Sequence, residues 1–180
     1  MAKVIILNGP PGSGKDVIAE QLVRTGCQQR SFKTALYPAV ASVFGLTVDA
    51  VIKACADRSG KDSPSSLFKG LSPRQALIHV SEDRVKPVLG DSYFGHCLAA
   101  TIHTGMYIVS DGGFASEIKP ILQAGHKVCI VHLYREGCTF QNDSRRYIQD
   151  FPELTTRYVN NGTLRDAGIG ILRIATGIFN

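Results

Sequence analysis

The chain has 180 residues, of which 44% are hydrophobic, so its length and composition predict one folded domain with a full core and exclude an intrinsically disordered protein. The net charge of +5 and the pI near 9.0 suit anionic partners. The basic residues are scattered and carry no aromatic-basic RNA signature, so nucleic acid is not expected as the main partner.

The cellular location is expected to be the cytoplasm. No apolar run approaches the roughly 20 residues that span a bilayer, so no membrane association is expected. The start "MAKVIILNG" is too short an apolar stretch for a signal peptide, and no small-residue cleavage site follows it. Five cysteines are spread without a C-x-x-C pair, which predicts free thiols and no zinc site. The oligomeric state stays open, with a homodimer as one option.

The first third of the chain alternates a strand pattern with helical patterns. "KVIILN" (3–8) is a β-branched apolar run typical of a buried parallel strand. A glycine-rich loop follows, and "KDVIAEQLVRTG" then repeats its apolar residues at helical spacing. "SFKTALYPAVASVFG" predicts a second helix, which Pro38 kinks or restarts. "DRSGKDSPSS" (57–66) predicts a flexible loop.

Two further helices are expected before the next strand. "SPRQALIHVSEDRVKPVL" begins with Ser72 as a helix cap and Pro73 at the first helical position. "DSYFGHCLAATIHTG" predicts another helix, with Asp91 or Ser92 as its cap.

The rest of the chain returns to strands. "MYIVSD" (106–111) and "KVCIVHLY" (127–134) predict two strands, and "FASEIKPILQAGH" predicts the helix between them. A shorter strand, "TRYVNN", precedes a last helix from Thr163. This alternation predicts an α/β fold with a mostly parallel central sheet. Ligands of such sheets bind at the carboxyl ends of the strands, which here are Asn8, Asp111, Tyr134–Arg135 and Asn160–Asn161.

A phosphate-loop pattern, Gly9-x-x-x-x-Gly14-Lys15, lies directly between the first strand and the first helix, as that motif requires. Glycines let backbone N–H groups turn toward phosphate oxygens, and the helix N-terminus adds a favourable dipole. Lys15 supplies positive charge for the β- and γ-phosphates of ATP. A glycine-rich turn without a ligand is the alternative. The expected ATP-binding residues of the loop are Gly12, Ser13, Gly14, Lys15, Asp16 and Val17.

Asp16 stands where this motif usually carries a serine or threonine that binds Mg²⁺ through its hydroxyl. A carboxylate is a good oxygen ligand for Mg²⁺, directly or through water. We therefore expect Mg²⁺ as cofactor and Asp16 as its ligand. The alternative role of Asp16 is that of an acid in the first turn of a helix.

"GSGKD", taken with the rest of the chain, resembles the bacteriophage deoxynucleoside monophosphate (dNMP) kinases, P-loop kinases that transfer the γ-phosphate of ATP to a dNMP. The resemblance covers most of the chain in order. It implies a three-layer P-loop kinase fold, one domain over 1–180 with a short lid at about 135–150, and ATP and a dNMP as ligands. A phage origin would place the protein in the host cytoplasm.

The same Gly-Lys-Asp ending also occurs in animal-type phosphomevalonate kinases, which provide an alternative function. A protein that holds ATP for regulation without transferring phosphate is a second alternative. The arginines outside the loop favour a kinase, because a protein that only binds ATP needs no second phosphate site.

The resemblance also implies an acceptor site. "SFKTALYPAVASVFGL" is similar to the segment that lines the monophosphate site, which implies substrate contacts by Phe32, Lys33 and Tyr37. "LSPRQAL" is similar to a segment whose arginine meets the acceptor phosphate, here Arg74. Phe32 could equally be a core aromatic, and Arg74 a solvent-facing residue in the first turn of a helix.

The catalytic and lid residues are implied in the same way. "YIVSDGGFASE" is similar to the strand that ends in an aspartate near the transferred phosphate, here Asp111, with Glu117 six residues later. "LYREGCTFQNDSRRYI" is similar to the lid, which opens with Arg135-x-Gly137 and continues as Asn142-Asp143-Ser144. "VNNGTLRDA" is similar to the turn beside the adenine ring, which implies an ATP contact by Asn161. Asp111 could instead be a turn-forming residue before two glycines.

Phosphoryl transfer needs in-line positioning and positive charge around the transferring group. We expect that charge from Lys15, Mg²⁺ and lid arginines, with Arg135 and Arg145 as catalytic residues and Arg146 as a substrate-binding residue. The last two are adjacent and point apart on regular structure, so only one of them is expected to reach the phosphates. The alternative for either is a solvated charge on the lid.

Two positions depart from the family pattern. The family often carries an arginine two residues after the strand aspartate, and this chain has Gly113 there. Arg145 or Arg146 is the nearest substitute. Tyr37 stands where a lysine is common, with Lys33 one turn earlier. The choice of substrate is therefore expected to differ from that of better-known members.

Overall fold

The computed structural model describes residues 1–57, 59–141, 143 and 145–180. Arg58, Asn142 and Ser144 lie outside the described residues, and with them two positions of the expected lid. The described chain forms one five-stranded sheet in the order β2-β3-β1-β4-β5, and every neighbouring pair is parallel. The strands are β1 (Ala2–Asn8), β2 (Gln28–Arg30), β3 (Gly105–Val109), β4 (Lys127–Tyr134) and β5 (Thr155–Val159).

The central strand β1 is buried on both faces, as its continuous apolar run predicts. Val4 and Ile6 point into the core on one face of the sheet, and Ile5 and Leu7 into the core on the other. This alternation follows from the period of two in a strand. The predicted α/β fold with a parallel central sheet is confirmed.

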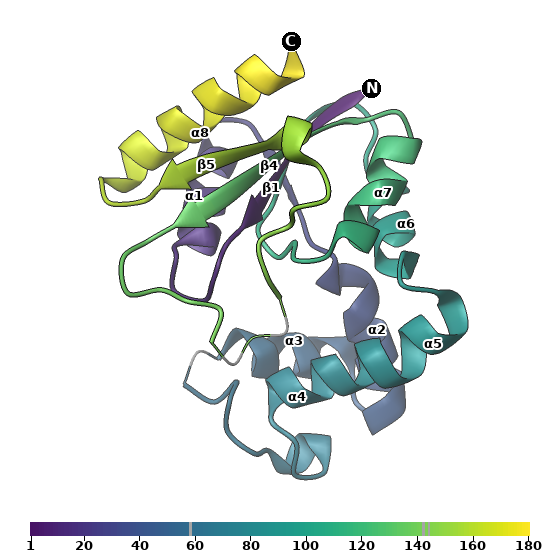
Figure 1. The fold of residues 1–180 in the computed structure, drawn as a ribbon. Helices are drawn as coiled ribbons and strands as arrows, with labels where there is room; N and C mark the ends of the chain where they lie inside the picture. Colours follow the sequence, from purple (N-terminus) through teal and green to yellow (C-terminus); the bar gives the residue numbers. More distant parts are fainter. Residues whose placement is uncertain (58, 142, 144) are drawn as a thin grey trace.

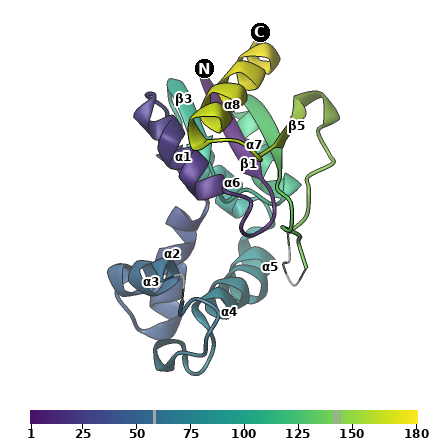
Figure 2. The same ribbon diagram turned by 90° about the vertical axis from the view of Figure 1, so that its left-hand side faces the viewer.

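Helices cover both faces of the sheet and extend beyond one end of it. Helices α1 and α8 pack on one face, and α6 and α7 on the other (Figure 1). Helices α2 to α5 lie together below the sheet (Figure 2). The helices are α1 (Lys15–Arg24), α2 (Lys33–Phe44), α3 (Val48–Ala56), α4 (Pro73–Ile78), α5 (Lys86–Leu89), α6 (Tyr93–Ala99), α7 (Ala115–Gln123) and α8 (Leu164–Phe179).

A continuous helical stretch from Pro73 to Leu89 contains a wide turn in its middle. Ser72 caps it as predicted, because its hydroxyl accepts a hydrogen bond from the Gln75 N–H at 3.2 Å. Between α4 and α5 the residues His79–Val85 form a π-helix, η2. Pro87 lies two residues after the end of η2, and a proline in an α-helix removes a hydrogen bond and crowds the carbonyl four residues earlier. The wider turn accommodates that proline, and such turns are frequent at functional sites.

Some elements differ from the expected ones. The short strand β2 consists of polar residues, so it lacks the apolar pattern on which a strand prediction depends. Helix α3 begins after Thr47, whose hydroxyl accepts a hydrogen bond from the Ala50 N–H at 3.2 Å. Two short 3₁₀ turns, η1 (Ser66–Phe68) and η3 (Pro152–Leu154), precede α4 and β5.

Among the described residues, no single helix is long and apolar enough to cross a membrane. Only taken together do helices α2 and α3 have the length and apolar composition of a membrane span, and the chain bends by 112° between them.

The close packing of α6 on α7 yields a prediction about stability. A Cβ added at Gly95 would collide with the Glu117 carbonyl oxygen and lie 2.9 Å from Cγ of Pro120. We expect Gly95→Ala to destabilise the protein by about 1–3 kcal/mol in denaturant unfolding, because the packed helices must separate. Gly177→Ala is the control, since a Cβ there meets no atom within 4 Å. Equal stability of the two variants would contradict the prediction.

Candidate active site

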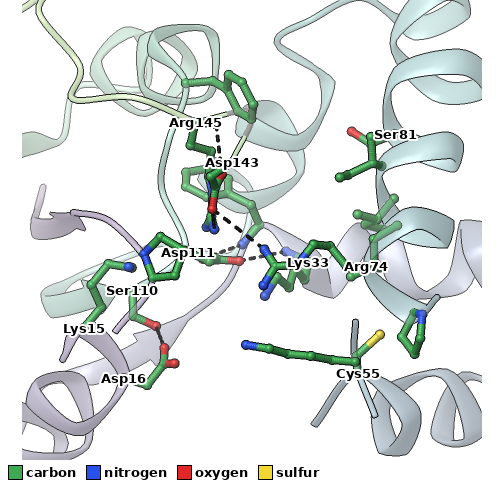
Figure 3. A pocket seen from close by; sticks show the side chains of 18 of the residues that line it. Lys15, Asp16, Lys33, Cys55, Arg74, Ser81, Ser110, Asp111, Asp143 and Arg145 are labelled. Atoms are coloured by element: carbon green, nitrogen blue, oxygen red, sulfur yellow. Dashed lines mark hydrogen bonds and ion pairs between the residues drawn. The ribbon is translucent and has the colours of Figure 1, made fainter. Parts of the chain in front are cut away.

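A cavity of about 670 Å³ lies between the phosphate loop, the end of β3, the helices α2 to α4 and the π-helix η2 (Figure 3). It brings together most of the residues that the sequence predicts for the site. Those that line it are Gly12, Gly14, Lys15, Asp16, Val17, Phe32, Lys33, Arg74, Asp111, Arg135 and Arg145.

The phosphate loop is held in shape by contacts within itself. Gly12 and Gly14 have φ angles of 81° and 97°, a left-handed conformation that favours glycine. The buried Ser13 hydroxyl donates to the Pro10 carbonyl at 2.8 Å. The Lys15 ammonium donates to the carbonyls of Gly9 at 2.6 Å and Pro10 at 2.8 Å, so it folds back over the loop.

The loop lysine lies in an environment that disfavours its own charge. Burial, with a smaller contribution from the positive charge of Arg145, lowers the pKa of Lys15 to about 8. The negative charges of Asp16 and Asp143 act in the opposite direction. An anion bound beside Lys15 would favour the ammonium form, so the site is suited to a phosphate group.

Asp16 offers the oxygen donors that a magnesium ion needs. Its Oδ1 accepts a hydrogen bond from the Ser110 hydroxyl at 2.9 Å, and both residues line the cavity (Figure 3). Among the described residues, no group of three or more His, Cys, Asp or Glu could hold a metal. Mg²⁺ uses one or two carboxylates and takes its other ligands from phosphates and water, so this donor set fits it. Asp16 also lies in the first turn of α1, the alternative role that the sequence left open.

Asp111 follows the end of β3 and organises the start of α2. Its Oδ2 accepts from the Ser31 hydroxyl at 2.7 Å and from the Lys33 N–H at 3.3 Å. Its Oδ1 accepts from the Phe32 N–H at 3.3 Å. Asp111 therefore sets the orientation of two other residues that the sequence predicts for the acceptor site.

The lid contributes two arginines to the cavity. Nη1 of Arg135 donates to the Gly12 carbonyl at 3.2 Å. Arg145 binds Asp143 with two hydrogen bonds, at 2.9 Å from Nε to Oδ1 and at 2.7 Å from Nη2 to Oδ2. Burial acts to raise the pKa of Asp143, but the hydrogen bonds and charge of Arg145 hold that pKa below its usual range.

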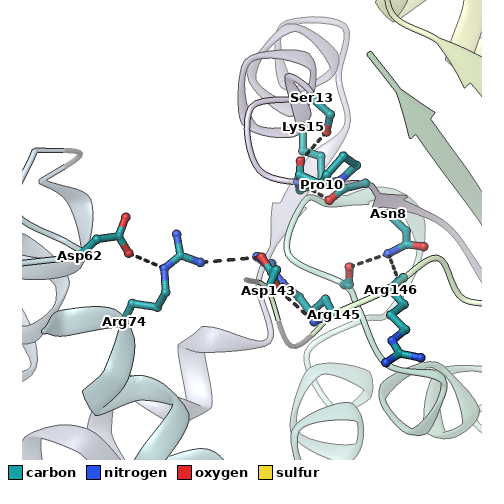
Figure 4. A network of polar contacts seen from close by, with 11 residues as sticks. Asn8, Pro10, Ser13, Lys15, Asp62, Arg74, Asp143, Arg145 and Arg146 are labelled. Carbon is teal, nitrogen blue, oxygen red and sulfur yellow. Dashed lines mark hydrogen bonds and ion pairs between the residues drawn. The ribbon is translucent and has the colours of Figure 1, made fainter. Parts of the chain in front are cut away.

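Arg74 approaches the same lid carboxylate from the opposite side of the cavity. Its Nε donates to Oδ1 of Asp62 at 2.5 Å, and its Nη1 lies 3.7 Å from Oδ2 of Asp143 (Figure 4). The Asp143 carboxylate thus lies between Arg74 and Arg145. Two cations that converge on one carboxylate also suit a phosphate group.

Four predicted residues do not line the cavity. Ser13 lies beneath the loop, and Tyr37 packs against the core, where burial raises its pKa to about 12. Arg146 is exposed, and Figure 4 shows its side chain directed away from Arg145. Asn161 is exposed as well, whereas the buried Asn160 donates to the Ser13 carbonyl at 2.9 Å. The roles assigned to these four residues stay predictions.

The structure adds a buried acid to the cavity wall. Glu117, 6% exposed, accepts hydrogen bonds from the backbone N–H groups of Gly113 and Phe114, each at 3.3 Å. Burial, with a smaller contribution from the charge of Asp111, raises its pKa to about 8. Lys86 lies 4.2 Å from the centre of the Phe114 ring and binds Glu82 at 2.6 Å. The sequence pattern did not predict that Glu117 and Lys86 are buried, because their burial depends on how α5 and α7 pack.

Comparison with known proteins bears on the fold alone. No protein-family profile and no curated protein matches the chain. Among solved structures, it is similar to a shikimate kinase from Acinetobacter baumannii in complex with shikimate (16% identity, TM-score 0.49), covering 98% of this chain and 94% of that one. A gluconokinase from Sinorhizobium meliloti (14%, TM-score 0.46) covers 98% and 95%. An APS kinase from Mycobacterium tuberculosis, in complex with AMPPNP and APS (13%, TM-score 0.44), covers 99% and 97%. The structure itself shows a parallel sheet with a glycine-rich loop after β1 and helices on both faces.

The raised pKa of Glu117 predicts a specific dependence of stability on pH. Its folded pKa of about 8 exceeds the ordinary 4.5, so the folded state binds more protons between these values. Stability should therefore fall as pH rises from 4.5 to 8. Glu117→Gln keeps an oxygen for the two N–H groups but has no titrating carboxyl, so this fall in stability with pH should be absent.

The measurement is the free energy of unfolding of both proteins from pH 4.5 to 9. As pH rises, the free energy of unfolding of Glu117→Gln should increase relative to that of the wild type. The total change should be about 1.4 kcal/mol for each unit by which the folded state raises the Glu117 pKa, and it should level off above pH 8. A difference that does not change with pH would contradict the buried, protonated carboxyl.

Proposed function

We propose that this protein is an ATP-dependent kinase of nucleoside monophosphates, with a deoxynucleoside monophosphate as the acceptor. One observation carries the proposal: a single cavity holds two sets of cations. One set lies at the loop and lid, and consists of Lys15, Arg135 and Arg145. The other lies on the helical side, and consists of Lys33, Lys61 and Arg74. A kinase whose acceptor already carries a phosphate needs both sets.

The first set suits the triphosphate of ATP. The left-handed glycines and the start of α1 direct backbone N–H groups toward phosphate oxygens. Asp16, with Ser110 beside it, would hold Mg²⁺, which when bound neutralises charge on the phosphate oxygens. Arg135 binds the Gly12 carbonyl, so its guanidinium already lies against the loop. Asn161, at the end of β5, is proposed to contact the adenine.

The second set suits an acceptor that is both anionic and flat. Within the described residues, neither Lys33 nor Lys61 forms an ion pair with a carboxylate. Aromatic rings lie on the wall of the same cavity, at Phe32, Phe94 and Phe114. Rings of this kind stack favourably on a nucleobase. They favour a nucleoside monophosphate over an aliphatic acceptor such as phosphomevalonate.

The transfer step needs little covalent work from the protein. The γ-phosphoryl group passes to the acceptor phosphate in line, and the residues supply position and positive charge. Lys15 and Arg145 are close enough for the charge of one to lower the pKa of the other. They lie where negative charge must be balanced during transfer. Asp111 acts by holding Phe32 and Lys33 at the acceptor side.

The proposal is tested by ADP release from ATP and Mg²⁺ with each dNMP, each ribonucleoside monophosphate and phosphomevalonate. Stimulation by one or more dNMPs is expected, and Lys15→Ala should reduce it by at least about 100-fold with the fold retained. Turnover with phosphomevalonate alone would replace the proposed acceptor. ATP binding without any turnover would indicate a protein that binds ATP for regulation.

A substitution of Arg74 tests whether this residue binds the acceptor rather than ATP. Arg74→Ala removes a cation from the acceptor side, so KM for the dNMP should rise about 10-fold or more, the loss of one charge-assisted contact. The affinity for a non-hydrolysable ATP analogue should stay within about twofold, since Arg74 belongs to the proposed acceptor set on the helical side of the cavity. The exposed Arg146 provides a matched control, because Arg146→Ala removes a lid arginine outside the cavity. A loss of ATP affinity in Arg74→Ala would contradict this assignment.

A further inference from the structure

The stem of Arg145 lies directly on the backbone of Gly113. A Cβ added at Gly113 would lie 2.5 Å from both Cγ and Cδ of Arg145, and 3.1 Å from its Cβ. The first two distances are shorter than side-chain carbons tolerate, so no other residue fits here without displacing the arginine. Gly113 does not have a positive φ, so the backbone itself would accept an alanine. The three atoms nearest to such a Cβ all belong to Arg145.

The backbones on either side of this contact are fixed by one buried side chain. Nδ2 of Asn8 donates to the Gly112 carbonyl at 3.4 Å and to the Arg146 carbonyl at 3.1 Å. Asn8 thereby links the residue before Gly113 to the residue after Arg145 (Figure 4). A larger side chain at position 113 could not be accommodated by moving the two segments apart without breaking these hydrogen bonds.

The guanidinium is held where the cavity receives an anion. Arg145 is 22% exposed and binds Asp143 with two hydrogen bonds. The hydrogen bonds and negative charge of Asp143, and the charge of Asp111, raise the pKa of Arg145 and favour its charged form. Arg145 and Lys15 line the same cavity (Figure 3), and the charge of Arg145 lowers the Lys15 pKa. The lid thus delivers a second cation to the side of the loop lysine.

We propose that Gly113 is a positioning residue, whose missing side chain lets the lid place the Arg145 guanidinium beside Lys15 to bind a phosphate oxygen. A side chain at 113 would push the stem of Arg145 out of the cavity. Whether this phosphate belongs to the transferred group or to the acceptor rests on the proposed function. The binding of an anion by Arg145 does not depend on it.

The kinetic test compares Gly113→Ala, Arg145→Ala and the double variant. Gly113→Ala should lower kcat/KM for the dNMP by at least about tenfold and weaken binding of a non-hydrolysable ATP analogue, in both cases approaching the loss in Arg145→Ala. The double variant should be no worse than Arg145→Ala, because both changes remove the same interaction. Gly177→Ala, with no neighbour within 4 Å, is the matched control and should equal the wild type.

A second readout needs no turnover. Inorganic pyrophosphate is titrated into the same four variants and the wild type by calorimetry. Its affinity should fall to the same extent in Gly113→Ala, Arg145→Ala and the double variant. If the wild type phosphorylates no nucleoside monophosphate but this pattern holds, the proposed function fails and the role of Gly113 stands. If the wild type is active and Gly113→Ala matches it in both assays, the role of Gly113 is refuted alone.

Melting temperatures keep the test decisive if Gly113→Ala folds poorly. In the double variant the colliding Cγ and Cδ atoms are absent, so its melting temperature should exceed that of Gly113→Ala. A melting temperature equally low in both would show that the alanine collides with something other than Arg145. Additive losses of pyrophosphate affinity in the double variant would likewise overturn the proposal, since they would mean that Gly113 and Arg145 act independently.

Discussion

The site depends on the side-chain amide of Asn8, which is 1% exposed at the end of β1. Besides its two donated hydrogen bonds to the carbonyls of Gly112 and Arg146, its Oδ1 accepts from the Ile148 N–H at 2.9 Å. Removing a buried amide of this kind leaves its partners unsatisfied, which costs more than the hydrogen bonds contribute. Because the phosphate loop begins at the next residue, one amide fixes the lid and the β3–α7 connection relative to the loop.

Around that anchor the cavity concentrates positive charge and balances it only in part. Asp143 lies between Arg74 and Arg145, and its carboxylate is held ionised by Arg145 against the effect of burial. A phosphate carries more charge and more acceptor oxygens than one carboxylate. An anion that reaches the two arginines therefore competes with Asp143 for the same donors. Arg145 lowers the pKa of Asp143, and it adds to the effect of burial in lowering the pKa of Lys15.

The sequence predicts the local features of this structure well and the long-range ones poorly. The apolar run before Asn8, the loop glycines and the Ser72 cap each depend on a few neighbouring residues, and the structure contains all three features. Of the adjacent asparagines in "VNN", the sequence singled out Asn161, but it is Asn160 that contacts the loop, through a hydrogen bond across 147 positions. The entry of Arg145 rather than Arg146 into the cavity depends on such distant contacts as well.

Gly113 shows how a local feature of the sequence depends on a long-range contact. As a departure from a family pattern it indicates only a missing cation, because nothing nearby in the sequence shows what fills the space. The stem of Arg145 fills it, so the cation comes from the segment after β4 instead of from the β3–α7 connection. Asn8 binds the carbonyl of the next residue, Arg146, and thereby fixes the backbone that carries this guanidinium.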